Sequence, residues 1–127
     1  METSVTLTLA GERFRPVAEE ALRRLYLGRE EVREAAGNGV DVLISGCIGP
    51  RGDGYVVGEV MSAKEAQGYH SAQVATFAST NSDLVSALTL NYAAEAVGIA
   101  RAAAEAGIPS VISFTVETDG RLPSGQE

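Results

Sequence analysis

Apolar residues along the chain fall into short continuous runs that are separated by longer stretches with helical spacing. The continuous runs cover residues 42–45, 84–88 and 111–116 and contain many β-branched side chains. Runs of this length, bounded by glycine, proline or polar residues, are typical of strands that are covered on both faces. A weaker strand is predicted over 4–9, where polar and apolar residues alternate.

The spacing between these runs predicts helices. Residues 16–27 carry apolar side chains at helical intervals, and Pro16 suits the first helical position. Gly28 interrupts the pattern, residues 30–36 either continue it or not, and the glycines at 37–39 end it. Ser62 and Glu65 form a capping box that predicts a helix reaching about residue 78. The buried stripe that we expect on that helix consists of Ala66, Tyr69, His70, Gln73, Val74 and Phe77.

A further helix is predicted to follow the run at 84–88. Asn91 is a plausible N-cap, Gly107 suits the C-cap, and Pro109 prevents continuation. Small residues at helical spacing predict one narrow buried face, formed by Ala93, Ala96, Val97, Ala100, Ala103 and Ala104.

The alternation of strands and helices predicts the fold class. Strand, helix, strand, helix and strand at this spacing indicate parallel βαβ units with right-handed crossovers, so we predict an α/β fold. A length of 127 residues suits one domain, which we expect to cover 1–127. Ligands of such folds bind at the carboxyl ends of the strands, so the site should be built on VLISGCIGPRGDGY, residues 42–55.

Composition excludes several classes of partner. The net charge of −7 would repel a phosphate backbone, so nucleic acid is not an expected partner. No apolar run approaches the roughly 20 residues that span a bilayer, and the N-terminal residues do not resemble a signal peptide. The lone Cys47 cannot form an internal disulfide, which favours a reducing, cytoplasmic location.

Two features near the end of the first strand and one residue on a predicted helix leave alternatives open. The glycines of 46–54 match no phosphate-binding fingerprint, and a tight turn is the more ordinary interpretation. Cys47 is either a nucleophile or ligand or, more commonly, a small buried hydrophobic residue. His70 is either a base or ligand or, more commonly, a packed and hydrogen-bonded histidine.

Polar residues are concentrated at the ends of the later strands. Alternation places Ser113, Thr115 and Glu117 on one face of the last strand, which indicates a lined pocket. The Glu117 carboxylate would hold an amino group or act as a base there, or else it is simply solvated. Ser86 and Thr89 flank the end of the preceding strand and face the same alternatives.

Four stretches carry a family resemblance: VLISGCIGPRGDGY, the YHSAQV helix, DLVSALTLNYAAEAVGIARAA and GIPSVISFTVETDGRLPSGQ. From about residue 39 to 127 the chain resembles the homocysteine S-methyltransferase family, whereas 1–38 match poorly. The resemblance implies a partial (β/α)8 TIM barrel with three to four parallel strands, and transfer of a methyl group to the thiol of homocysteine to make methionine. The residues that we expect to bind substrate are Ser45, Gly46, Cys47, Thr89, Thr115 and Glu117.

Two departures from the family pattern qualify that expectation. Family members hold zinc with cysteines of later barrel strands, and those cysteines lie downstream of the point matching Glu127, so this chain lacks them. Leu88 stands where the family commonly has a glutamate that holds the substrate's amino group, so a related thiol or amino-acid-like acceptor, with Glu117 as substitute carboxylate, is the alternative to homocysteine.

The resemblance therefore leads to three hypotheses. The first is a fragment of a methyltransferase that is inactive in isolation. The second is a non-catalytic small-molecule-binding or assembly module that completes its barrel with another chain, because open sheet edges favour self-association. The third is a different α/β barrel enzyme that uses Cys47 directly.

Overall fold

The structure is a computed structural model that describes residues 41–127 continuously and, before them, residues 16, 20, 23–24, 27–32, 34–35 and 37. The chain divides into two compact units, 1–42 and 43–127. In the first unit the described residues from 16 to 35 are helical. Gly28 lies within this helical part and does not interrupt it, and Gly37 follows with a φ of 83°. The predicted strand at 4–9 lies outside the described residues.

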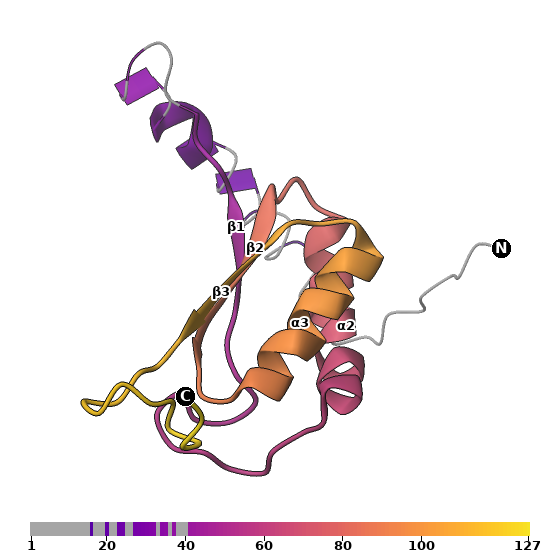
Figure 1. Ribbon diagram of the computed structural model, residues 1–127. Helices are drawn as coiled ribbons and strands as arrows, with labels where there is room; N and C mark the ends of the chain where they lie inside the picture. The colour runs from indigo at the N-terminus through magenta and orange to yellow at the C-terminus, as the bar shows by residue number, and fades with distance from the viewer. Residues whose placement is uncertain are drawn as a thin grey trace, which may run out of the picture. The chain divides into compact units, whose positions relative to one another are not determined.

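The second unit is a three-stranded parallel sheet with intervening helices (Figure 1). Its elements are, in chain order, β1 (Ser45–Ile48), α2 (Ala63–Ala78), β2 (Leu84–Leu90), α3 (Ala93–Ala106) and β3 (Ser110–Phe114). The strands lie in the order β1-β2-β3, and both neighbouring pairs are parallel. The α/β class and the partial-barrel architecture are therefore confirmed.

Helices α2 and α3 lie on the same side of the sheet (Figure 1). Between the helices and the sheet is an apolar core that consists of Ile48, Val74, Val85, Ala87, Leu90, Ala96, Ile99, Ala102, Ala103 and Ile108. The strand residues that alternate with these core positions point to the opposite face, which we call the open face: Ser45, Cys47, Ser86, Leu88, Val111 and Ser113. The continuous apolar runs predicted strands covered on both faces, but within the second unit α2 and α3 cover only one.

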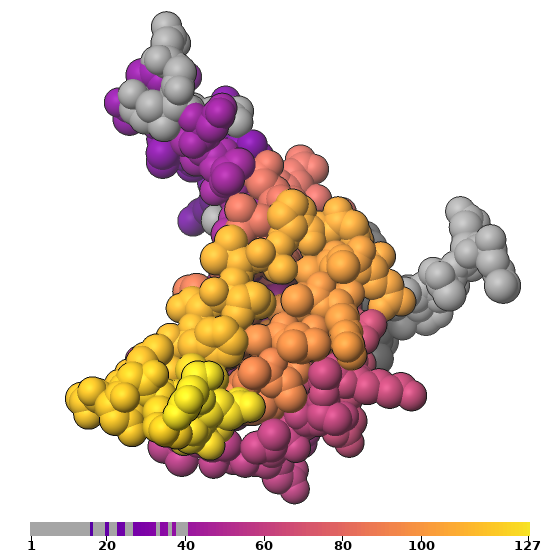
Figure 2. Space-filling view, viewed as in Figure 1, coloured from indigo at the N-terminus to yellow at the C-terminus, as the bar shows by residue number. Residues whose placement is uncertain are grey.

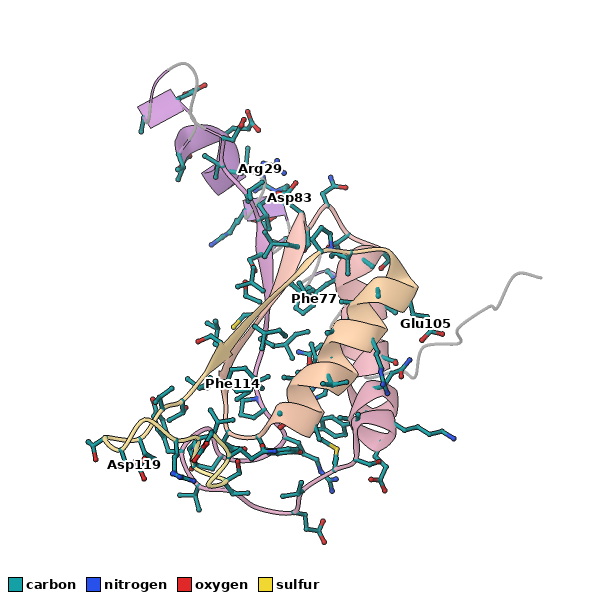
Figure 3. All side chains as sticks on the ribbon, in the orientation of Figure 1. Arg29, Phe77, Asp83, Glu105, Phe114 and Asp119 are labelled. Atoms are coloured by element: carbon teal, nitrogen blue, oxygen red, sulfur yellow. The ribbon has the colours of Figure 1, made fainter. Side chains whose placement is uncertain are left out.

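Strand β1 begins three residues later than predicted and includes the first glycine of the expected loop. It runs from Ser45 through Gly46 and Cys47, whereas the sequence placed the strand at 42–45. The reason is tertiary, because the ring of Phe77 at the end of α2 points to the sheet and lies on Gly46 (Figure 3). Strand β2 also extends to Leu90, beyond the predicted end at residue 88.

Helix α2 follows its sequence signals closely. The Ser62 hydroxyl accepts a hydrogen bond from the Glu65 N–H at 3.3 Å, and the Glu65 carboxylate accepts from the Ser62 N–H at 2.8 Å. The predicted capping box and the helix end are confirmed. The buried stripe is narrower than predicted, because Tyr69 and Gln73 are exposed and only Ala66, His70 and Val74 are buried.

Helix α3 presents a different face from the predicted one. Its buried residues are Glu95, Ala96, Gly98, Ile99, Ala102 and Ala103. Of the six residues that we expected on the buried face, only Ala96 and Ala103 are buried. The other four are exposed, because Ile99 packs into the core instead: Ala93, Val97, Ala100 and Ala104. The N-cap is Tyr92 rather than Asn91, whereas Gly107 ends the helix with a φ of 70°, as predicted. Within the described residues, no helix combines the length and apolar character that crossing a membrane requires.

Candidate functional site

The carboxyl ends of the three parallel strands lie at one edge of the sheet, and two predicted site residues meet there. The Thr115 hydroxyl, just after β3, donates to the carbonyl of Gly54 at 2.8 Å. Gly54 also lies against Thr89, because a Cβ on this glycine would stand 2.8 Å from the Thr89 Oγ1. Gly54, Thr89 and Thr115 therefore form a contiguous group at this edge, which we call the threonine edge.

Thr89 has an unusual backbone conformation. Its φ is 57°, and the pairing of β2 with β3 shifts register between Ala87 and Leu90. A β-branched residue with positive φ is strained, and such strain tends to occur at functional sites. The Thr89 hydroxyl donates to the Leu88 carbonyl at 2.7 Å. The strained backbone thus presents this side chain beside Gly54.

The predicted residues of β1 lie elsewhere on the sheet. Ser45 is at the amino end of the strand, and its hydroxyl lies 2.6 Å from that of Ser86. Cys47 is an exposed free thiol on the open face, in the edge strand β1, and is paired in register with Ser86. Because Thr89 is three residues further along β2, Cys47 lies roughly 10 Å from the threonine edge along the strand direction.

The remaining residues of the expected site lie away from the threonine edge or in exposed positions; they are Gly46, Leu88 and Glu117. Gly46 faces the helices, where the Phe77 ring covers it. Leu88 is 42% exposed on the open face, so the position of the family's glutamate presents an apolar side chain there. Glu117 lies in the exposed segment after β3, and its N–H donates to the Arg121 carbonyl at 2.8 Å. The structure therefore gathers Thr89 and Thr115, and it separates them from Ser45 and Gly46.

A buried hydrogen bond joins the two helices, and the sequence pointed to only one of its two residues. The His70 Nε2 lies 3.0 Å from the Glu95 Oε1, and the two side chains are 1% and 0% exposed. The packed, hydrogen-bonded interpretation of His70 is therefore confirmed. Glu95 was missed, although a single acidic residue within the small-residue stretch AAEAVGIA was a signal. The same Oε1 accepts the backbone N–H of Arg51 at 2.6 Å.

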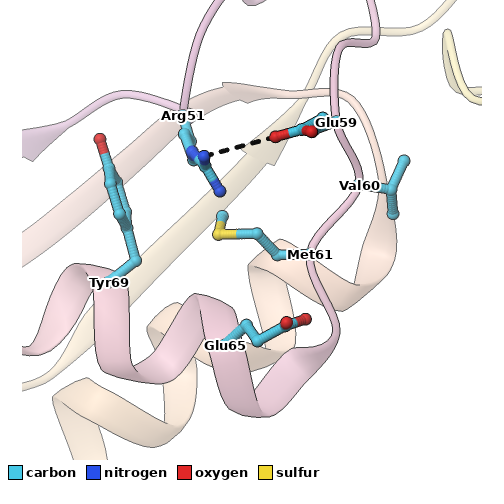
Figure 4. A pocket seen from close by; sticks show the side chains of 6 residues that line it. All are labelled: Arg51, Glu59, Val60, Met61, Glu65 and Tyr69. Atoms are coloured by element: carbon cyan, nitrogen blue, oxygen red, sulfur yellow. Dashed lines mark ion pairs between the residues drawn. The ribbon is translucent and has the colours of Figure 1, made fainter.

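A separate pocket of about 510 Å³ lies between the loop after β1 and the first turns of α2 (Figure 4). The Arg51 guanidinium lies 3.6 Å from the Glu59 carboxylate and 5.5 Å from the centre of the Tyr69 ring. Hydrogen bonds from Ser62 lower the pKa of Glu65, which also lines the pocket. None of the six predicted substrate-binding residues lines it; its lining consists of Arg51, Glu59, Val60, Met61, Glu65 and Tyr69.

The residues of this chain do not fit a zinc site. A protein zinc site takes three or four ligands, chiefly thiolates and imidazoles, and the sequence has one cysteine and one histidine. Cys47 is exposed on the open face, whereas His70 is buried and bonded to Glu95. Among the described residues, no three His, Cys, Asp or Glu side chains form a group able to hold a metal ion.

Parallel strands, helices on one face and polar residues at the carboxyl edge define a barrel-type α/β domain with its ligand edge at the strand ends. The sequence model of the homocysteine S-methyltransferase family matches residues 5–127, and the chain belongs to this methyltransferase family. The match also covers residues 5–38, where the resemblance was weak. Neither the search of curated proteins nor that of solved structures found a significant match.

Proposed function

We propose that this chain provides the acceptor side of a methyl transfer to a thiol such as homocysteine. Membership of the family supports the reaction class. The observation that carries the proposal is the threonine edge, where a strained Thr89 and Thr115 meet at the end of parallel strands. This is the part of an α/β barrel where substrates bind.

The proposed roles follow from side-chain chemistry. Thr89 and Thr115 offer hydroxyls to the amino-acid end of the acceptor, and the exposed Glu117 supplies a carboxylate for its amino group. Cys47 and Ser45 lie on the open face further back along β1, with Ser45 at the amino end of the strand, and Gly46 faces the helices. In the reaction the acceptor thiol gives its proton to solvent, and the resulting thiolate forms a bond to the methyl carbon of the donor. The bond between that methyl group and the rest of the donor breaks, and the demethylated donor leaves with the bonding electron pair.

A binding titration tests the acceptor assignment. Homocysteine is titrated into ¹⁵N-labelled protein, with homoserine as the matched compound that replaces the thiol by a hydroxyl. We expect the amide resonances of Thr89, Thr115 and Glu117 to shift with homocysteine and less with homoserine. Shifts confined to the pocket beside Arg51 and Tyr69, or no shifts at all, would refute this assignment.

We also propose that the zinc ligands come from outside these residues, as in a fragment of a methyltransferase, because the chain contains one cysteine and one histidine. The isolated chain is then expected to make no methionine from homocysteine, a methyl donor and added zinc. Methionine detected by mass spectrometry above a protein-free control would contradict this. The lone free cysteine supports a reducing compartment such as the cytoplasm.

A second candidate is a non-catalytic binding or assembly module that completes its barrel with another chain. The apolar side chains of Leu88, Val111 and Phe114, each more than a third exposed, favour it. Light scattering distinguishes the candidates, since a well-defined dimer favours the module and polydisperse aggregates favour a fragment of an enzyme.

Replacing Cys47 by serine tests the remaining hypothesis, that of an enzyme which uses the Cys47 thiol directly. Full activity of this variant in any assay would refute that hypothesis.

A further inference from the structure

Three polar side chains at the start of α3 bond to backbone groups of the loop between β1 and α2, residues 49–62. The Asn91 amide donates to the Asp53 carbonyl at 2.9 Å. The Tyr92 hydroxyl accepts from the Met61 N–H at 3.2 Å. The Glu95 carboxylate accepts from the Arg51 N–H at 2.6 Å. The sequence Asn-Tyr-x-x-Glu thus holds the loop at three places. Glu95 binds it near its start at Arg51, Asn91 binds it at Asp53, and Tyr92 binds it near its end at Met61.

These side chains are buried at an energetic cost that core packing alone would not require. Asn91, Tyr92 and Glu95 are 2%, 3% and 0% exposed. A buried carboxylate costs several kcal/mol unless it is paired, and an apolar residue of similar size is often at least as stabilising. The Nε2 of His70 provides a second partner for the Glu95 Oε1. Burial also raises the pKa of Tyr92, which keeps its hydroxyl neutral.

We propose that Asn91, Tyr92 and Glu95, with His70 behind Glu95, form a clamp that positions the 49–62 loop at the threonine edge. The bond from Asn91 holds Asp53, and the next residue, Gly54, touches both Thr89 and Thr115. Loops longer than about 12 residues without secondary structure are usually either functional or disordered, and the three bonds from the start of α3 hold this loop in one place. The clamp residues are therefore positioning residues for the acceptor site, and this role rests on the proposed function.

Backbone groups of the same stretch, at Asn91 and Ala93, hold the C-terminal segment. The Asn91 carbonyl accepts from the Ser124 N–H at 3.2 Å, and the Gln126 side chain accepts from the Ala93 N–H at 2.9 Å. Gln126 thereby caps α3, because Tyr92 makes no side-chain capping bond. In Figure 2 the C-terminal residues, in yellow, lie against the start of α3. The 49–62 loop and the C-terminal segment are thus both held by one short stretch of chain, residues 91–95.

Amide hydrogen exchange of the 127-residue chain, read by NMR, tests the clamp without any ligand. Tyr92→Phe removes only the hydroxyl, and we expect the Met61 amide to exchange about tenfold faster. Glu95→Ala should release the Arg51 amide to a similar extent, whereas Glu95→Gln keeps an oxygen acceptor and should largely retain its protection. The matched controls are Tyr69→Phe and Glu105→Gln, which change exposed side chains of the same kinds.

The core amides of Val85 and Ile99 separate positioning from general destabilisation. The clamp predicts that their exchange stays unchanged in Tyr92→Phe. An equal rise at the core amides, or no rise at Met61, would overturn the clamp. If Glu95→Ala does not fold, the exchange rates of the Met61 and core amides in Tyr92→Phe alone test the clamp.

Homocysteine affinity then tests the link to function. Tyr92→Phe should weaken binding several-fold while Tyr69→Phe leaves it unchanged. A released loop with unchanged affinity would overturn the positioning role. A wild-type chain that binds no homocysteine would refute the proposed function, and the exchange data would still decide the clamp.

Discussion

The ring of Phe77 lies directly on the backbone of Gly46, so that a Cβ on this glycine would stand 2.4 Å from the Phe77 Cγ. This contact joins the end of α2 to the middle of β1. It explains why a glycine that looks like the start of a loop lies inside a strand. Glycine serves here to admit an aromatic ring rather than to turn the chain.

Gly46→Ala should therefore destabilise the fold by about 1–3 kcal/mol, because an added methyl group overpacks a contact with a ring. Phe77→Leu should be destabilising by itself, and the double variant should lose less than the sum of the two. Urea denaturation of the four proteins measures the coupling. Strictly additive losses would show that the ring moves away without cost.

Helix packing provides a matched pair of glycines. A Cβ on Gly98 would lie 2.6 Å from the Gln67 backbone nitrogen and 2.8 Å from the Ala63 carbonyl oxygen, whereas nothing lies within 4 Å of one on Gly68. Gly98→Ala should force α2 and α3 apart and lower the melting temperature. Gly68→Ala, at an exposed helical position, should stabilise by up to about 1 kcal/mol. Equal changes in melting temperature for Gly98→Ala and Gly68→Ala would contradict the close approach of the two helices at Gly98.

The strained Thr89 should show a conflict between stability and binding. Thr89→Gly removes the penalty of positive φ and should stabilise the fold by about 1 kcal/mol, while homocysteine binding weakens. Thr89→Ala is the control, because it keeps a β-carbon at the strained position and removes only the hydroxyl. Thermal melting measures the stability of each variant, and a titration with homocysteine measures its affinity. A destabilised Thr89→Gly would show that the side chain's contacts outweigh the strain.

The capping box should make stability depend on pH. Hydrogen bonds from the Ser62 hydroxyl and backbone lower the pKa of Glu65 below the unfolded value of 4.5. The carboxylate therefore adds stability that is fully present above pH 4.5 and is lost as the pH falls through the lower, folded pKa.

We expect Glu65→Gln to be less stable than the wild type at pH 6, with the difference vanishing in strong acid. Ser62→Ala removes the largest cause of the lowered pKa of Glu65. The stability of this variant should therefore depend less on pH than that of the wild type. Denaturation midpoints across pH 2–6 measure both. A difference that is constant over this range would contradict the shifted pKa.

The sequence anticipated features that depend on neighbours in the chain. Ser62 and Glu65 marked the start of α2, and Gly107 with Pro109 marked the end of α3, because capping groups act within one helical turn. The parallel arrangement also followed from the order of elements, since the crossovers require helices between the strands.

The candidate site was anticipated only in part. Thr89 and Thr115 were expected at the strand ends, where the structure places them, but Ser45 lies at the opposite end of β1. Glu95 was missed because its partners, His70 and the Arg51 amide, are distant in the chain. Residue types alone do not show which buried acid meets which donor.

The amino-acid sequence by itself determined the α/β class, the parallel order and the helix ends, since these depend on periodicity and local hydrogen bonds, and the resemblance of four sequence stretches indicated the family. Only the tertiary structure decided where β1 begins, which face of α3 is buried, and how the 49–62 loop is held. Each of these depends on a contact between residues far apart in the chain, such as Gly46 with Phe77 or Arg51 with Glu95. Such contacts form only when the helices have docked on the sheet.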